Sequence, residues 1–219
     1  MSTTIQFLNS NNKLISEQQA NQLNRFSKNT FIDGILKKEE DYYENKLRGG
    51  IYHLSPGENV IEILSSIGVG LNWAIVSNKQ IINNYITQEV RWYDDILQIK
   101  SQYAKEVTDN LGNHIATVHF DTVTNQPKGA FKVFNYGNQQ IPWGDPGDLF
   151  PEDSEISFLF SDDGSIENIK MNYNIINNDS YWRRLDKFLT DAGDMLEEIG
   201  LTQEKLYYFT HVEPVVPNF

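Results

Sequence analysis

Along the middle of the chain, short runs rich in Val, Ile, Tyr, Phe and Trp recur between clusters of Asn, Asp and Gly. Runs of this kind, bounded by turn residues, are typical of β-strands. Every second residue is apolar at Ala116, Val118 and Phe120, so we expect one face of the sheet to be buried. Because hairpins follow one another, the pattern predicts an antiparallel meander whose strands cover residues 71–77, 80–93, 96–107, 114–121, 129–136, 155–161 and 166–173.

A helical pattern follows these strands. Apolar residues recur at three- and four-residue spacing from Trp182 to Ile199, just before Gly200. This spacing predicts an amphipathic helix over 180–199 that covers the sheet, with Phe188 and Leu189 on its buried side. The aromatic tail 206–219 contains two prolines, so we expect it to be extended.

The N-terminal third mixes both patterns. A strand is predicted over 3–8, and Ser16 with Gln19 forms a capping-box pattern that predicts a helix over 16–28. A second helix, over 58–67, follows a Ser-Pro-Gly-Glu start signal. Between them, the apolar alternation predicts a hairpin with strands at 35–43 and 47–54.

These elements predict an α+β fold. We expect a curved antiparallel meander of about six or seven strands that packs against the C-terminal helix, with two further short helices in the N-terminal third. The length favours a single globular domain over 1–219, in which residues 1–70 pack on residues 71–219.

Composition removes several kinds of chemistry. The chain has no cysteine, which excludes disulfides, thiolate metal ligands and thiol nucleophiles. Its four histidines include no His-x-x-x-His pair, so we expect neither a metal nor a cofactor. Residues 1–6 carry no basic segment, and no long apolar run follows, which favours a cytoplasmic protein.

Charge is distributed unevenly. Residues 1–110 hold 11 basic and 13 acidic side chains, a net charge of −2, whereas residues 111–219 hold 7 and 17, a net charge of −10. Eight carboxylates lie between residues 133 and 169, where there is no Lys or Arg. Such a field attracts cationic partners and repels nucleic acid and anionic membranes. We therefore expect a basic protein partner, no nucleic acid and no membrane.

The segment 141–153 is the candidate binding site. It combines three prolines, two glycines, two aromatic residues and four carboxylates, and long loops without secondary structure are often functional. We interpret it as a partner-binding loop with aromatic anchors and an acidic rim, formed by Trp143, Asp145, Asp148, Phe150, Glu152 and Asp153. The alternatives are an ordered surface loop and a calcium site, although the spacing differs from the regular calcium loop.

No catalytic motif marks the chain. His119 with Asp121, and His211 with Glu213, lie two residues apart, as an oriented imidazole requires, but no nucleophile elbow occurs. The leading hypothesis is therefore a non-catalytic acidic binding protein, in its most concrete form a bacterial immunity protein that neutralises a toxin. The alternatives are a small-ligand or carbohydrate-binding module and a hydrolase with a carboxylate or histidine base.

Overall fold

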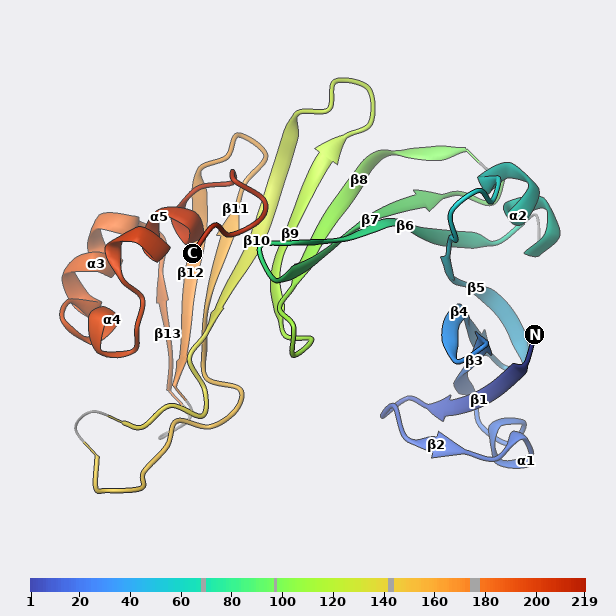
Figure 1. Cartoon of the computed structure of the whole chain (residues 1–219), viewed down its shortest axis with the longest axis horizontal. Helices are drawn as coiled ribbons and strands as arrows, with labels where there is room; N and C mark the ends of the chain where they lie inside the picture. Colours follow the sequence, from blue (N-terminus) through green and yellow to red (C-terminus); the bar gives the residue numbers. More distant parts are fainter. Residues whose placement is uncertain (68–69, 97, 142–143, 174–177) are drawn as a thin grey trace. The chain divides into compact units, whose positions relative to one another are not determined.

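A computed structural model describes residues 1–67, 70–96, 98–141, 144–173 and 178–219. These residues form thirteen strands joined in a single mixed sheet, in the order β13-β12-β11-β10-β9-β8-β7-β6-β5-β4-β3-β1-β2 (Figure 1). The strands are β1 (Thr3–Asn9), β2 (Leu14–Ile15), β3 (Arg25–Ile32), β4 (Ile35–Tyr43), β5 (Lys46–His53), β6 (Asn72–Ile82), β7 (Tyr85–Tyr93), β8 (Ile99–Thr108), β9 (His114–Asp121), β10 (Pro127–Asn135), β11 (Glu155–Phe160), β12 (Ile166–Tyr173) and β13 (Asn178–Trp182). The helices are α1 (Glu17–Ala20), α2 (Val60–Ile67), α3 (Leu185–Ala192), α4 (Met195–Glu198) and α5 (Gln203–Thr210).

The predicted α+β class is wrong. The fold is mainly β, with about 15% helix, and its sheet has nearly twice the predicted number of strands. Some of the excess lies in the N-terminal third, where the predicted helix over 16–28 ends at Ala20 and β3 begins at Arg25. The Ser16–Gln19 capping box is present, but Phe26, Thr30 and Phe31 favour an extended backbone. Pairing with β1 on one side and with β4 on the other provides hydrogen-bond partners for the backbone N–H and C=O groups of β3.

The predicted C-terminal helix is divided. Residues 178–182 form β13, which pairs with β12, and the helical segment is broken at Gly193, whose φ is 42°. Glycine adopts this left-handed conformation without steric cost, so it separates α3 from α4. The tail also differs from the prediction, because α5 occupies some of the segment expected to be extended. Phe188 is fully buried as predicted, whereas Leu189 is 36% exposed.

Two hairpins show how turns decide the strand boundaries. The hairpin of β4 and β5 forms as predicted, with Glu44 and Asn45 at positive φ in its two-residue turn. The break expected between the predicted strands 71–77 and 80–93 instead lies within β6. That strand continues to a turn at Asn83 and Asn84, both of which also have positive φ.

One connection in the described sheet is parallel. Strands β5 and β6 pair in parallel, from Gly49 opposite Asn72 to His53 opposite Val76, and α2 connects them. The amide N–H groups of Ile61 and Glu62 donate to the side-chain oxygen of Asn59, which caps α2. This helix covers one face of the strand pair through a buried cluster of Tyr52, Leu64, Trp73, Ile75 and Tyr93.

The chain divides into two compact units. Unit 1 comprises residues 1–78 and 89–103, and unit 2 comprises residues 79–88 and 104–219. The core of unit 1 is the cluster beneath α2. The core of unit 2 is aromatic: Phe158 contacts Phe188 edge to face at 5.9 Å and stacks with Phe209 at 5.9 Å between ring centroids, which places α3 and α5 on the sheet. No helix in the described residues is both long and apolar enough to cross a membrane.

Candidate functional site

The described residues of the predicted loop 141–153 extend the β10–β11 hairpin. The amide N–H of Tyr136 donates to the carbonyl oxygen of Ser154 at 3.0 Å. The amide N–H of Phe150 donates to the carbonyl oxygen of Gln139, also at 3.0 Å. A β-bridge then joins Gln140 to Leu149. The backbone ladder thus continues well past β10, which the loop-like composition of the segment did not reveal.

Phe150 fixes this hairpin to unit 2. Its ring is 2% exposed and meets the ring of Tyr136 edge to face, with centroids 5.1 Å apart. The hydroxyl of Tyr136 donates in turn to the carbonyl oxygen of Asn172 at 2.7 Å. The Phe150 side chain is therefore an internal anchor of the hairpin, and it is not presented to a partner in this conformation. Trp143, the second predicted anchor, lies outside the described residues.

The four predicted carboxylates are all exposed. Asp145, Asp148, Glu152 and Asp153 lie on the hairpin, which we call the acidic hairpin (residues 136–154). Asp148 also shapes it, since a carboxylate oxygen accepts the amide of Asp145 at 2.9 Å. No group of three or more potential metal-ligating side chains occurs among residues 1–67, 70–96, 98–141, 144–173 and 178–219, so the calcium alternative gains no geometric support.

The acidic hairpin belongs to a strongly acidic unit. Unit 2 contains nine Lys or Arg and nineteen Asp or Glu, a net charge of −10, whereas unit 1 contains nine and eleven, a net charge of −2. Some cations of unit 2 form ion pairs within the unit: Arg184 pairs with Asp186, and Lys187 pairs with Asp191. The hydrogen bond from Arg184 lowers the pKa of Asp186. Further exposed carboxylates of unit 2 are Asp162, Asp163, Glu167, Asp194, Glu197, Glu198 and Glu204.

In each of the two predicted histidine–carboxylate pairs, one member forms hydrogen bonds with other groups. Asp121 accepts the amides of Val123 and Thr124 at 2.9 and 2.7 Å, and also the Thr124 hydroxyl. These hydrogen bonds lower its pKa, and they occupy one carboxylate oxygen in a turn. His211 lies beside the carbonyl oxygen of Tyr207, with its Nδ1 at 2.9 Å.

A histidine–carboxylate contact does occur at a place that no local sequence signal marks. Nε2 of His53 on β5 lies 2.9 Å from a carboxylate oxygen of Glu39 on the neighbouring strand β4. The two residues are 14 positions apart, so only the strand register brings them together. Both side chains are about one-third exposed.

Lys132 has the chemistry of a reactive amine but the surroundings of a structural one. Its side chain is fully buried, and burial lowers its pKa to about 7, with Glu213 opposing the change. A neutral lysine can act as a base or nucleophile. Here, however, Nζ donates to the carbonyl oxygens of Tyr208 and Pro214, so the chain itself encloses the amine.

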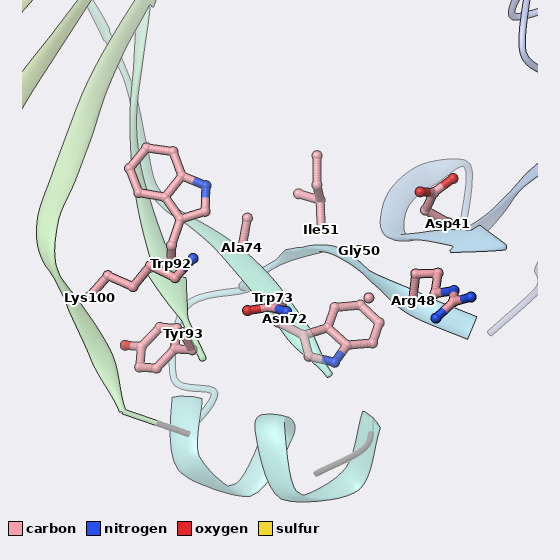
Figure 2. A pocket seen from close by; sticks show the side chains of 11 residues that line it. Asp41, Arg48, Gly50, Ile51, Asn72, Trp73, Ala74, Trp92, Tyr93 and Lys100 are labelled. Atoms are coloured by element: carbon pink, nitrogen blue, oxygen red, sulfur yellow. The ribbon is translucent and has the colours of Figure 1, made fainter. Parts of the chain in front are cut away.

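A pocket of about 360 Å³ lies on unit 1, over β5 and β6 (Figure 2). Ile51, Ala74 and Trp92 point to one side of the sheet, while Trp73 and Tyr93 point to the other side, toward α2 (Figure 2). Asp41, Arg48 and Lys100 provide its charged groups. We name it the β5–β6 pocket.

Two glycines in the lining of this pocket allow close contact between strands. A Cβ atom on Gly49 would lie 1.9 Å from the carbonyl oxygen of Asn72, and one on Gly50 would lie 1.9 Å from that of Glu39. Side chains are therefore excluded at both positions, which lets β4, β5 and β6 approach closely. The Gly-Gly pair inside a predicted strand is the sequence signal that could have revealed this close approach.

Comparison with protein-family models, with curated proteins and with solved structures finds no match to this chain.

Proposed function

We propose that this protein is a non-catalytic binding protein that holds a basic protein partner on the acidic surface of unit 2. The observation that carries the proposal is the net charge of −10 on this unit, together with the exposed carboxylates of the acidic hairpin. A surface of one charge sign attracts the opposite sign at long range and orients the encounter. Nucleic acid and anionic membranes would be repelled by the same surface.

The backbone hydrogen bonds of the acidic hairpin support this role. Its ladder to Gln139 and Leu149 and the burial of Phe150 hold the four carboxylates in place before a partner arrives. A preorganised surface loses less conformational entropy on binding than a flexible loop. Trp143, which the sequence predicts as an apolar anchor, remains part of the proposal.

A narrower form of the proposal is an immunity protein acting in the cytoplasm. Carboxylates presented to a cationic phosphate-binding site would block a nuclease toxin, because they imitate the charge of its substrate. A hydrolase is not proposed, since Asp121, the carboxylate of one predicted histidine–carboxylate pair, is bonded into a turn.

The test compares two variants with equal changes in charge. One converts Asp145, Asp148, Glu152 and Asp153 to Asn or Gln, and the control converts Glu17, Glu44, Glu62 and Asp95 of unit 1, which are also exposed, in the same way. Each variant and the wild type are used for affinity capture from the native host. We expect the wild type and the unit 1 control to retain a basic protein that the hairpin variant loses.

Association rates measured with the purified partner complete the test. At low salt the hairpin variant should associate about tenfold more slowly than the control, with a weaker salt dependence, because charges at an interface rim act mainly on encounter. Capture of no basic protein, or equal association rates for the two variants, would show that the acidic surface serves only solubility.

A further inference from the structure

We propose that the β5–β6 pocket of unit 1 binds a small, flat organic anion, with an aromatic ring on its apolar side and a carboxylate or phosphate group on its cations. The pocket lies within one unit, and its occupant is separate from the protein partner proposed for unit 2. Three features support this assignment: unpaired cations, an apolar floor and a suitable volume.

The cations are the first feature. Unit 1 has nine basic side chains, and five of them form ion pairs with carboxylates: Arg25, Lys28, Lys37, Lys38 and Arg91. Among the four others, Arg48 and Lys100 both line the pocket, and no carboxylate of the described residues lies within ion-pair distance of either. Two such cations beside one hollow, in a chain of net charge −12, favour an anionic ligand.

Arg48 is suited to an oxyanion. Its guanidinium stands over the Tyr43 ring, 5.5 Å from the centroid, and such a contact restrains a long side chain. A restrained guanidinium presents parallel N–H donors that match a carboxylate or phosphate group. Asp41, the acidic group of the pocket, is itself paired with Arg25 at 3.2 Å, which offsets its negative charge.

The floor of the pocket is the second feature. Ile51, Ala74 and Trp92 point to the same side of the sheet (Figure 2). Indole faces favour stacking with flat rings. Lys100 extends toward Trp92 (Figure 2), so a ring on the floor would lie close to a positive charge.

The volume is the third feature. The pocket of about 360 Å³ is near the lower end of the range for small-molecule sites, about 300–1,000 Å³. It suits a two-ring acid or a mononucleotide and excludes a folded protein segment. These limits define the ligand by its chemistry: one flat ring system and one oxyanion group.

NMR titration of the full chain tests the proposal. The chain has four tryptophans, so its indole N–H signals are few, and Trp92→Phe identifies the signal of Trp92. The ligands are 1-naphthoate and adenosine 5′-monophosphate, with 1-naphthalenemethanol and adenosine as neutral counterparts and inorganic phosphate as the ring-free anion. We expect at least one aromatic anion to shift the Trp92 signal with a Kd below about 1 mM, and its neutral counterpart and phosphate to bind at least about tenfold more weakly.

Substitutions at the rim make the test specific. Arg48→Gln and Lys100→Gln should each weaken binding about fivefold or more, whereas Lys46→Gln, an exposed cation on the same strand as Arg48, should leave it unchanged. Asp41→Asn should strengthen binding, because it removes a negative charge from the rim.

Three results would overturn the proposal. The first is that neither aromatic anion moves the Trp92 signal up to about 5 mM. The second is binding that Arg48→Gln and Lys100→Gln leave unchanged. The third is phosphate binding as tight as that of the aromatic anions, which would leave the floor without a role.

Discussion

Lys132 contacts Tyr208 twice, since its Nζ donates to the Tyr208 carbonyl oxygen at 2.9 Å and stands 3.7 Å from the centroid of the Tyr208 ring. The same Nζ donates to the carbonyl oxygen of Pro214 at 2.8 Å. The Tyr208 hydroxyl donates to the carbonyl oxygen of Val215 at 2.9 Å. One buried amine on β10 thus binds both α5 and the segment that follows it. Burial raises the cost of the charged form, which explains the lowered pKa of about 7.

This pKa predicts a stability that increases with pH. An unfolded lysine keeps its proton up to about pH 10.4, so between pH 7 and that value the unfolded chain binds more protons than the folded chain. The free energy of unfolding should therefore rise by up to about 2–3 kcal/mol from pH 7 to pH 9, as measured by urea denaturation. Lys132→Met should remove most of this rise, whereas Lys46→Met, at an exposed site, should preserve it. A flat wild-type profile would contradict the prediction.

Phe188 and Leu189 provide a matched pair on α3. Phe188 is fully buried against Phe158 and Trp182, whereas Leu189 is 36% exposed. Phe188→Ala should lower the free energy of unfolding by about 3–5 kcal/mol, and Leu189→Ala by less than about 1 kcal/mol. Urea denaturation of the two variants tests this. Equal losses would show that α3 is packed in a different orientation.

Gly50 should not tolerate a methyl group. Its Cβ would lie 1.9 Å from the carbonyl oxygen of Glu39 and 2.9 Å from the Trp73 ring, so Gly50→Ala must separate β4 from β5. We expect a loss above about 3 kcal/mol or failure to fold, judged by circular dichroism and thermal denaturation. Gly57→Ala is the control, because its Cβ has open space and its positive φ costs only about 1–2 kcal/mol. A fully stable Gly50→Ala variant would refute the close approach of these strands.

Glu58 stabilises the fold in its charged form. Burial acts to raise its pKa, but hydrogen bonds from Lys37, the Ser55 amide and Tyr52, together with the Lys37 charge, outweigh burial and lower it. The stability from this contact is therefore complete above the unfolded pKa, about 4.3, and is lost as the pH falls through the lower folded value. Glu58→Gln should destabilise the protein at pH 7, and the difference from the wild type should shrink on acidification. Glu62→Gln, at an exposed position of α2, should show no such change.

The sequence predicted those strands and turns that neighbouring residues determine. The alternation at Ala116, Val118 and Phe120 identified β9, and the turn at Glu44 and Asn45 separated β4 from β5. Strand β13 was missed because Trp182, with Phe188, fits a helical spacing, and only pairing with β12 makes its segment extended. Tertiary pairing overrides local propensity in such segments.

The same distinction applies to the candidate sites. Composition alone indicated that Asp145 and Glu152 would be exposed, since carboxylates are rarely buried. Composition did not indicate that Phe150 packs on Tyr136, because the continued backbone ladder brings these rings together. The β5–β6 pocket depends on the register of strands separated by α2, and no local pattern encodes that register.

The strand order determines how the sheet can be assembled during synthesis. Apart from β1 and β3, every pair of neighbouring strands is also consecutive in the chain, so each new strand finds its partner in the segment made just before it. Short loops close at low entropic cost, whereas the pairing of β5 with β6 spans α2 and the pairing of β1 with β3 spans β2 and α1. From β3 onward, each newly made strand therefore extends the same edge of the sheet, while β2 remains at the other edge. An unpaired edge can bind a foreign strand, so the growing edge is protected when the next strand of the chain pairs with it.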